Sequence, residues 1–174
     1  MIVIDIGCAK YGGDFSIERL LEEFRPEVLY GFDPMQGPDE YPWPPNPPDG
    51  PTFPTKAMRT YIEKKAAWTY DGEIGFSGSG LGGHIDPDGE NVPCFDLAGF
   101  IRSLPSDHEI ALKIDAEGAE YDLLEHLIAT RTDELLKLAW VEWHPKGQAV
   151  NSRPDKRRDL IEERIECDLH QWNW

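Results

Sequence analysis

Three aspartates, Asp5, Asp33 and Asp115, each lie at or near the end of a short apolar run of strand length. In open α/β sheets the carboxyl ends of parallel strands meet at one edge, and ligands bind in the crevice outside that edge. We therefore expect the three carboxylates to lie together along one rim, in the arrangement of a nucleotide-type cofactor site.

The loop after the first apolar run is rich in glycine. Gly7 lets the backbone pass close to a ligand, while Gly12 and Gly13 keep the bend tight before a helix whose amino-terminal dipole faces the same crevice. The spacing is not the GxGxxG of dinucleotide-binding folds, and the Lys-Ser/Thr pair of a phosphate-binding loop is missing. A ligand that carries positive charge is therefore favoured over a pyrophosphate.

Asp33 stands at the end of the second apolar run. An acid at this place fits the carboxylate that accepts hydrogen bonds from the 2′ and 3′ hydroxyls of a ribose. The alternative is that Asp33 is an ordinary turn residue before Pro34.

The apolar periodicity predicts alternating strands and helices, which is typical of a largely parallel sheet in a three-layered α/β fold. We expect a hairpin at Asp71-Gly72, and no helix in front of the first strand, which begins at residue 1. The expected strands are 1–6, 28–32, 59–68, 73–76, 110–115, 138–143 and an edge strand within 168–174, and the expected helices are 14–24, 95–104, 118–129 and 154–166.

Two segments lack a regular pattern. Residues 35–54 are rich in proline and sustain neither a helix nor a sheet ladder, so they form a lid or recognition loop, or else a surface insertion that buries Trp43. Residues 77–83 interleave glycine with serine, which favours mobility and would allow the neighbouring His84 to reach the site.

Length and composition limit the class of protein. A chain of 174 residues is expected to form one domain, 1–174. With 17 Lys and Arg against 33 Asp and Glu, the net charge of −16 disfavours nucleic acid and anionic membranes as partners. Three widely spaced cysteines, no secretory signal pattern and no long apolar run indicate a soluble, cytoplasmic protein that does not span a membrane.

The same residues resemble a known family, the FkbM-type enzymes among the class I S-adenosylmethionine-dependent methyltransferases. The resemblance spans nearly the whole chain, and its most specific part is the block Lys-Ile-Asp-x-Glu-Gly-x-Glu. The matching segments are Val3–Gly7, Tyr30–Pro34, Ala66–Trp68, Asp71–Phe76, Leu112–Leu124 and Val141–His144.

The resemblance implies a Rossmann-like class I methyltransferase fold, truncated at its N-terminus, with S-adenosyl-L-methionine as cofactor. It also implies O-methylation of a hydroxyl on a small molecule or a glycan. The chain departs from the family pattern at Ala9, where a small polar residue is usual, and at Gly12, which comes one residue late. The implied cofactor-binding residues are Asp5, Gly7, Cys8, Ala9 and Gly12 near the methionine end, Asp33 at the ribose, Ala67 and Trp68 near the adenine, and Asp115 at the transfer site.

Methyl transfer to a hydroxyl needs an aligned acceptor and a group that removes its proton. Asp115 and Glu117 follow one strand, and Glu142 and His144 follow the next, so these four candidate catalytic residues are expected to share one acidic pocket. Histidine titrates nearest neutrality, which makes His144 the candidate base.

These four residues also allow other interpretations. Asp115, Glu142 and His144 could instead hold Mg²⁺, which would orient and acidify the acceptor hydroxyl. Glu117 could simply satisfy backbone donors at a helix start, and His144 could be a turn residue before Pro145.

Two other function classes stay open for the whole chain. One is a Rossmann-like binding domain without turnover, and the other is a nicotinamide-dependent oxidoreductase, which the missing GxGxxG disfavours. If the sheet lacks a covering element at its front, the exposed apolar surface would suit a second copy, so we expect a possible homodimer.

Overall fold

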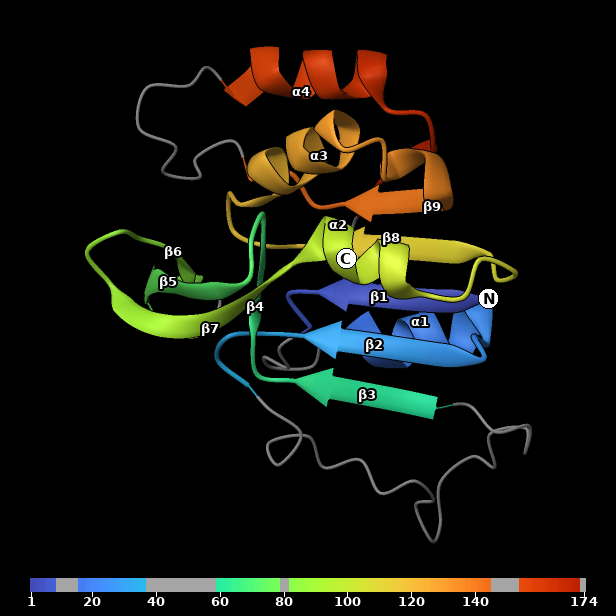
Figure 1. Ribbon diagram of the computed structural model, residues 1–174, viewed down its shortest axis with the longest axis horizontal. Coiled ribbons are helices and arrows are strands. Elements are labelled where there is room, and N and C mark those ends of the chain that lie inside the picture. The colour runs from blue at the N-terminus through green and yellow to red at the C-terminus, as the bar shows by residue number, and fades with distance from the viewer. Residues whose placement is uncertain (9–15, 37–58, 79–81, 145–153, 173–174) are drawn as a thin grey trace, which may run out of the picture.

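A computed structural model describes residues 1–8, 16–36, 59–78, 82–144 and 154–172. A six-stranded sheet forms the centre of the molecule, and all its neighbouring strands pair in parallel (Figure 1). Its order is β10-β9-β8-β1-β2-β3, so the expected parallel sheet is confirmed. The strands are β1 (Ile2–Ile6), β2 (Val28–Phe32), β3 (Arg59–Glu63), β8 (Ile110–Ile114), β9 (Leu136–Val141) and β10 (Asp168–Gln171).

The composition of the two central strands explains their place. Every residue of β1 and β8 is buried, as expected for strands covered on both faces, which carry apolar residues without alternation. The more polar β3 and β10 lie at the two edges, and β10 confirms the edge strand expected near the end of the sequence.

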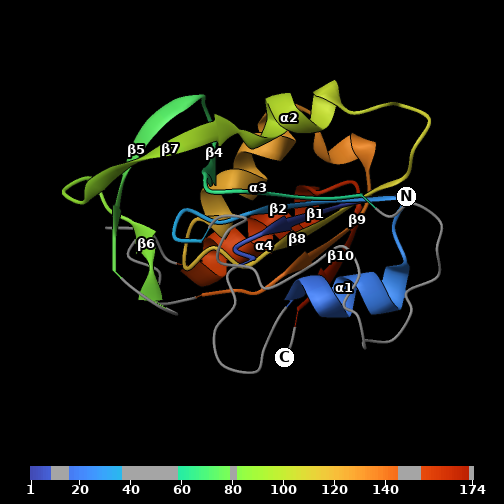
Figure 2. The same cartoon turned by 90° about the horizontal axis from the view of Figure 1, so that it is seen from below.

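Helices cover both faces of this sheet, which gives three layers (Figure 2). On one face α1 (Ser16–Phe24) buries Ile17, Leu20 and Leu21 against β1 and β2. The other face carries α2 (Leu97–Ser103), α3 (Glu120–Ala129) and α4 (Pro154–Arg164).

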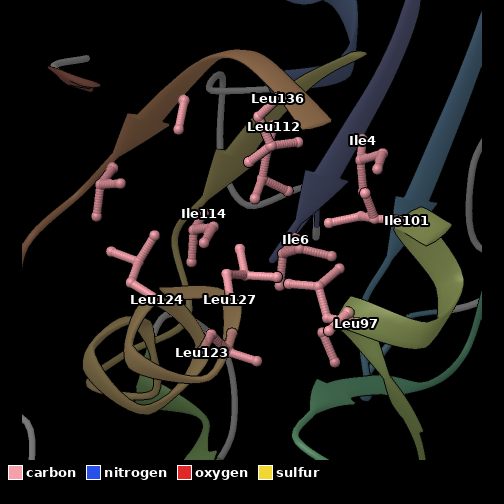
Figure 3. Packing of buried hydrophobic residues seen from close by; sticks show 14 of the residues in the cluster. Ile4, Ile6, Leu97, Ile101, Leu112, Ile114, Leu123, Leu124, Leu127 and Leu136 are labelled. Atoms are coloured by element: carbon pink, nitrogen blue, oxygen red, sulfur yellow. The ribbon is translucent and has the colours of Figure 1, made fainter. Parts of the chain in front are cut away.

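The larger core lies on the face covered by three helices (Figure 3). Ile4 and Ile6 of β1 and Ile114 of β8 pack there against Ile101 and Leu123. These side chains come from both central strands and from α2 and α3, so this core fixes the helices over the strands.

A second, four-stranded sheet differs from expectation. Its order is β4-β7-β5-β6, with β4 parallel to β7 and the other pairs antiparallel. The strands are β4 (Ala66–Trp68), β5 (Gly72–Ser77), β6 (His84–Ile85) and β7 (Glu90–Asp96).

The single strand expected over 59–68 is therefore wrong, because the charged residues Lys64 and Lys65 separate β3 from β4 and the Lys65 N–H donates to the Glu63 carbonyl. The expected hairpin pairing is also wrong, since β7 lies between β4 and β5. The pattern missed β7 because Pro93 interrupts it, and the helix expected from residue 95 begins at Leu97.

In the central sheet the chain continues from β1 to β2 and β3 on one side, and from β8 to β9 and β10 on the other side. The strand order therefore reverses between β1 and β8. This is the topological switch point where open α/β sheets bind ligands. In Figure 1 the second sheet lies on the side toward which the arrows of β1 and β2 point. The second sheet thus stands beside the expected ligand edge.

Two remaining expectations concern segments at the limits of the description. Of the proline-rich loop 35–54, only Met35 and Gln36 lie within the described residues. Among the helices that are described, none has the length and apolar character needed to cross a bilayer.

The packing predicts a stability difference between two leucines in helices. Leu123 of α3 is fully buried, whereas Leu160 of α4 is 48% exposed. We expect Leu123→Ala to lower the free energy of unfolding by about 2 to 5 kcal/mol through the cavity that it leaves. Leu160→Ala is the matched control and should change it by less than about 0.5 kcal/mol in urea denaturation. Equal effects would contradict the described core.

Candidate functional site

The three aspartates lie at the carboxyl ends of three adjacent strands, as predicted. Asp5 is in β1, and Asp33 and Asp115 directly follow β2 and β8, which flank β1. Asp5 pairs in register with Lys113 on one side and Gly31 on the other. Because side chains alternate along a strand, Asp33, Asp115 and the turn at Gly7 continue the same face of the sheet.

Gly7 occupies a position that only glycine fits. Its φ is +75°, and a Cβ placed there would lie 1.7 Å from the Asp115 carbonyl oxygen. The Gly7 N–H donates to the Phe32 carbonyl at 2.9 Å, and the Asp115 N–H donates to the Ile6 carbonyl at 3.0 Å. The ends of β1, β2 and β8 are thereby fixed to one another, and the predicted close backbone approach exists.

Asp5 lies inside the protein rather than on the rim. Its side chain is fully buried, and Ser16 of α1 donates a hydrogen bond to Oδ2 at 2.6 Å. Oδ1 lies 3.2 Å from the Lys113 ammonium nitrogen. Burial raises the pKa of the Asp5 carboxyl above its ordinary value, although Lys113 and Ser16 oppose that shift. Asp5 thus supports the site from beneath, and a cofactor would meet the backbone beyond it.

Lys113 is a residue that the sequence reasoning left without a role. Its side chain is fully buried, and Nζ donates to the Gly7 carbonyl at 3.1 Å and lies 3.3 Å from Asp115 Oδ2. Burial alone would lower the pKa of Lys113, but the charges of Asp5 and Asp115 raise it above its ordinary value, so the group is an ammonium ion. The sequence feature that could have indicated a role for this residue is the presence of a lysine within the apolar run Ile110–Ile114.

Asp33 has the turn role that was one of the two interpretations of this residue. The residue is 6% exposed, and Oδ1 accepts hydrogen bonds from the Met35 N–H at 2.7 Å and the Gln36 N–H at 2.9 Å. The turn after β2 therefore depends on this carboxylate, as the alternative interpretation held. Its position beside the Gly7 turn is the one predicted for a ribose-binding acid.

The four predicted catalytic residues converge as expected. His144 Nε2 lies 3.7 Å from Asp115 Oδ1, 3.7 Å from Glu117 Oε1 and 3.8 Å from Glu142 Oε1. These residues follow β8 and β9, which are neighbouring strands. The Glu142 N–H donates to the carbonyl of Ile114 at the end of β8 and holds the two strand ends together. The acidic pocket predicted from the ends of two strands is present, with the imidazole ring among the carboxylates.

A fifth residue, Glu120, orients the histidine. Glu120 is fully buried at the start of α3, and its Oε1 accepts from the His144 N–H at 2.7 Å and lies 3.1 Å from His144 Nδ1. Its Oε2 accepts from the Gly118 N–H at 2.8 Å. Sequence reasoning quoted Glu120 within a motif but gave it no role. Its signal was an acid three and four residues before Leu123 and Leu124, on the side that the helix expected over 118–129 buries.

The turn between β8 and α3 has an uncommon backbone. Glu117 has φ +48° and Gly118 has φ +103°, and a left-handed conformation costs a non-glycine residue on the order of 1 kcal/mol. The hydrogen bond from Gly118 to Glu120 stabilises this turn. Glu117 thus belongs to a built turn that places its carboxylate near His144.

The charges of the pocket change the protonation of its members. Burial alone would lower the pKa of His144, but the hydrogen bond to Glu120 and the charges of Glu120, Glu117 and Asp115 together raise it to about 9. Only about 1% of the imidazole is neutral at pH 7 with such a pKa. Burial also raises the pKa of Glu117, and the charge of His144 only partly opposes this. His144 is therefore a cation at neutral pH, and the expectation that it titrates nearest neutrality does not apply to this environment.

A cation could replace that proton. Ligand atoms of Asp115, Glu117 and His144 lie within 4.8 Å of one another, and Glu142 is adjacent to them. The trio differs from the predicted Mg²⁺ set in having Glu117 in place of Glu142. Binding a metal through His144 would require its Nε2 proton to leave. Two carboxylates suit a hard cation such as Mg²⁺.

The other predicted cofactor residues fall into three groups. Cys8 is fully buried in the core under α1, so only its backbone could face a ligand, and Ala67 is 6% exposed in the larger core. Trp68, at the end of β4, is half-buried. Ala9 and Gly12 lie outside the described residues.

A cavity of about 320 Å³ lies elsewhere, at the β10 edge of the sheet. None of the predicted site residues lines it, although Trp143 precedes His144 in the chain. Its lining residues are Trp143, Arg158, Glu162, Ile165, Cys167, Asp168, Leu169, His170 and Gln171.

Comparison with known proteins gave no match to a family model, to a curated protein or to a solved structure.

The geometry predicts a measurable pKa for His144. In an NMR titration of the histidine ring protons, assigned with a His144→Asn variant, His144 should titrate near pH 9. Glu120→Gln should lower that pKa by about one unit or more, since a unit corresponds to about 1.4 kcal/mol of lost interaction with the cation. Glu125→Gln, on the solvent side of the same helix, should leave it unchanged. A wild-type value near 6.5 would contradict the described pocket.

The same pKa predicts the direction of a pH effect on stability. Because the folded-state pKa of His144 is raised, its contribution is complete below about pH 6.5 and is lost as the pH rises through about 9. With allowance for solvent screening we expect a loss of about 1 to 2 kcal/mol over this range. Urea denaturation at several pH values should show a smaller decline for Glu120→Gln than for wild type. Parallel profiles would contradict the assignment.

Proposed function

We propose that this protein is an S-adenosylmethionine-dependent methyltransferase that methylates a hydroxyl on a small molecule or carbohydrate. The observation that carries the proposal is the placement of Asp33 and Asp115 on either side of the Gly7 turn at the switch point of the sheet. The resemblance of the motifs to the FkbM-type methyltransferases supports the same reading.

The spacing of the strands supports a ligand that lies across them. Neighbouring strands are about 4.8 Å apart, so the ends of β2 and β8 are separated by about 10 Å with Gly7 between them. A ribose would meet Asp33, and the chain that carries the sulfur would cross the Gly7 turn toward Asp115. Glycine at the middle position leaves the backbone open to this close approach.

The charges at this rim fit a cation better than a phosphate. The carboxylates of Asp33, Asp115 and Glu142 directly follow β2, β8 and β9, and the ammonium of Lys113 is buried against Asp5 and Asp115. A pyrophosphate would meet these acids, and the ammonium of Lys113 beneath the rim is already held between Asp5 and Asp115. The donor set therefore suits hydroxyls and a positively charged sulfur, and disfavours a nicotinamide dinucleotide.

When bound, S-adenosylmethionine would supply a methyl group on a positively charged sulfur. Transfer breaks the bond from carbon to sulfur, forms a bond from that carbon to the acceptor oxygen, and releases the hydroxyl proton to a base. His144 already holds a proton at neutral pH, so the carboxylates near it are the available bases. Burial raises the pKa of Glu117, which brings this carboxylate toward the matched acidity that proton transfer favours.

The other pocket residues would hold the acceptor and the charge. The His144 imidazolium can donate a hydrogen bond to the acceptor oxygen, and Glu120 fixes the ring for that purpose. Asp115, 16% exposed at its side chain, faces the point where the rim and the pocket meet. These positions allow alignment of a hydroxyl beside the sulfur, which is the main requirement of an in-line displacement.

A binding domain without turnover is the second candidate. The fully protonated His144 and the use of Asp33 Oδ1 in its own turn both favour ligand binding over catalysis. The two candidates share the same rim and differ only in whether a methyl group is transferred.

Calorimetric titration with S-adenosylhomocysteine tests the cofactor site. Asp33→Asn keeps an oxygen for the Met35 and Gln36 amides but removes the charge, so we expect about tenfold or more weaker binding from the loss of charge-assisted hydrogen bonds to the ribose. Asp133→Asn is the control. Asp133 lies just before β9, is also buried, and accepts a hydrogen bond from the Glu166 N–H. It should bind as wild type.

The outcomes separate the candidates. No binding of S-adenosylhomocysteine by the wild type at millimolar concentration, while NAD binds, would overturn the proposal in favour of an oxidoreductase. Binding together with transfer of a labelled methyl group to a hydroxylated acceptor would support the enzyme. Binding without transfer to any of a panel of sugars and small alcohols would favour the binding domain.

A further inference from the structure

A continuous polar network crosses the molecule beneath the rim. Ser16 donates to Asp5 at 2.6 Å, and Asp5 lies 3.2 Å from Lys113. Lys113 lies 3.3 Å from Asp115 Oδ2, and the other oxygen of Asp115 lies 3.7 Å from His144. The network joins α1, β1 and β8 to His144, which comes three residues after the end of β9, and Lys113 is its central member.

The position of Lys113 is costly for folding. Its side chain is fully buried near the carboxyl end of β8, on the face covered by α1, with Nζ 6.0 Å from the centre of the Trp172 ring. Removing an ammonium from water costs several kcal/mol, and well-packed apolar residues often replace a buried ion pair without loss of stability. Apolar residues in place of both Asp5 and Lys113 would therefore serve the core at least as well, so core packing alone does not account for this pair.

What lysine provides is contact with three groups at once. Its Nζ contacts the carboxylate of Asp5, the carbonyl of Gly7 and the carboxylate of Asp115. The last two belong to the carboxyl ends of β1 and β8, and the other oxygen of Asp115, Oδ1, lies 3.7 Å from His144 Nε2. We propose that Lys113 is a positioning residue that fixes the Gly7 turn and orients the Asp115 carboxylate toward His144.

The affinity readout of this role rests on the proposed function, whereas the hydrogen-exchange readout does not. The ammonium holds one oxygen of Asp115 and leaves the other for the pocket, so the carboxylate has one favoured orientation. It also holds the carbonyl at the point where the backbone passes closest to the expected ligand. Without it, both groups would be free to turn, and the rim would have to be ordered during binding.

The test uses Asp5→Asn as the reference background, because removing Lys113 alone would leave Asp5 buried and uncompensated. Adding Lys113→Met to this background gives a variant without the buried ion pair. Relative to Asp5→Asn, we expect amide hydrogen exchange at Gly7 and Asp115 to become about tenfold or more faster. The Leu123 amide in α3 serves as the internal reference and should not change.

Calorimetry gives a second readout. S-adenosylhomocysteine should bind to the double variant about tenfold or more weakly than to Asp5→Asn, while the denaturation midpoints of the two variants stay close. A double variant that is folded, exchanges at the same rate at Gly7 and Asp115 and binds equally well would overturn the positioning role. A uniform rise in exchange across the sheet would also overturn it, because this would indicate a merely structural role.

Two further arms keep the test decisive. If the methionine variant does not fold, Lys113→Gln in the same background keeps a hydrogen-bond donor without the charge, and the same local rise in exchange is expected. If the wild type does not bind S-adenosylhomocysteine, the proposed function fails, whereas the exchange rates still decide the role of Lys113.

Discussion

The structure depends on a buried ammonium ion held between two carboxylates. Lys113 of β8 contacts Asp5 of β1 and Asp115 at the end of its own strand, in the interior where an unpaired charge would be strongly unfavourable. These two strands are the centre of the sheet and lie where its order reverses. The same contact that satisfies the lysine therefore also holds one oxygen of Asp115 at the carboxyl ends of these strands.

The rim above this buried ion pair is acidic. The lysine offsets charge beneath the surface, whereas four carboxylates surround His144, those of Asp115, Glu117, Glu120 and Glu142. Such a field holds a proton on the imidazole and attracts any cation that reaches it. A metal ion and the proton on His144 are thus alternative ways of meeting one electrostatic requirement, because both would occupy Nε2.

The sequence predicted those features that depend on local pattern and order. Apolar runs that end in Asp5, Asp33 and Asp115 indicated parallel strands with acids at one edge, and the structure has them on adjacent strands. Strand β7 was missed because Pro93 breaks its pattern, and the division of 59–68 depends on which sheet each half joins. Neither feature can be predicted from the local sequence alone.

The site was predicted less completely than the fold. The convergence of Asp115 and His144 followed from their places after adjacent strands. The roles of Lys113 and Glu120 did not, because a pattern shows that a residue is buried but not which distant group it contacts. The pKa of His144 depends on carboxylates from α3 and from the ends of two strands, so no single segment could predict it.

The most direct measurement is a crystal structure of the protein with S-adenosylhomocysteine. The account predicts electron density across the ends of β2, β1 and β8, with the ribose hydroxyls at the Asp33 carboxylate and the sulfur facing Asp115. Density confined to another place, such as the cavity beside Trp143, with none over Gly7, would contradict it.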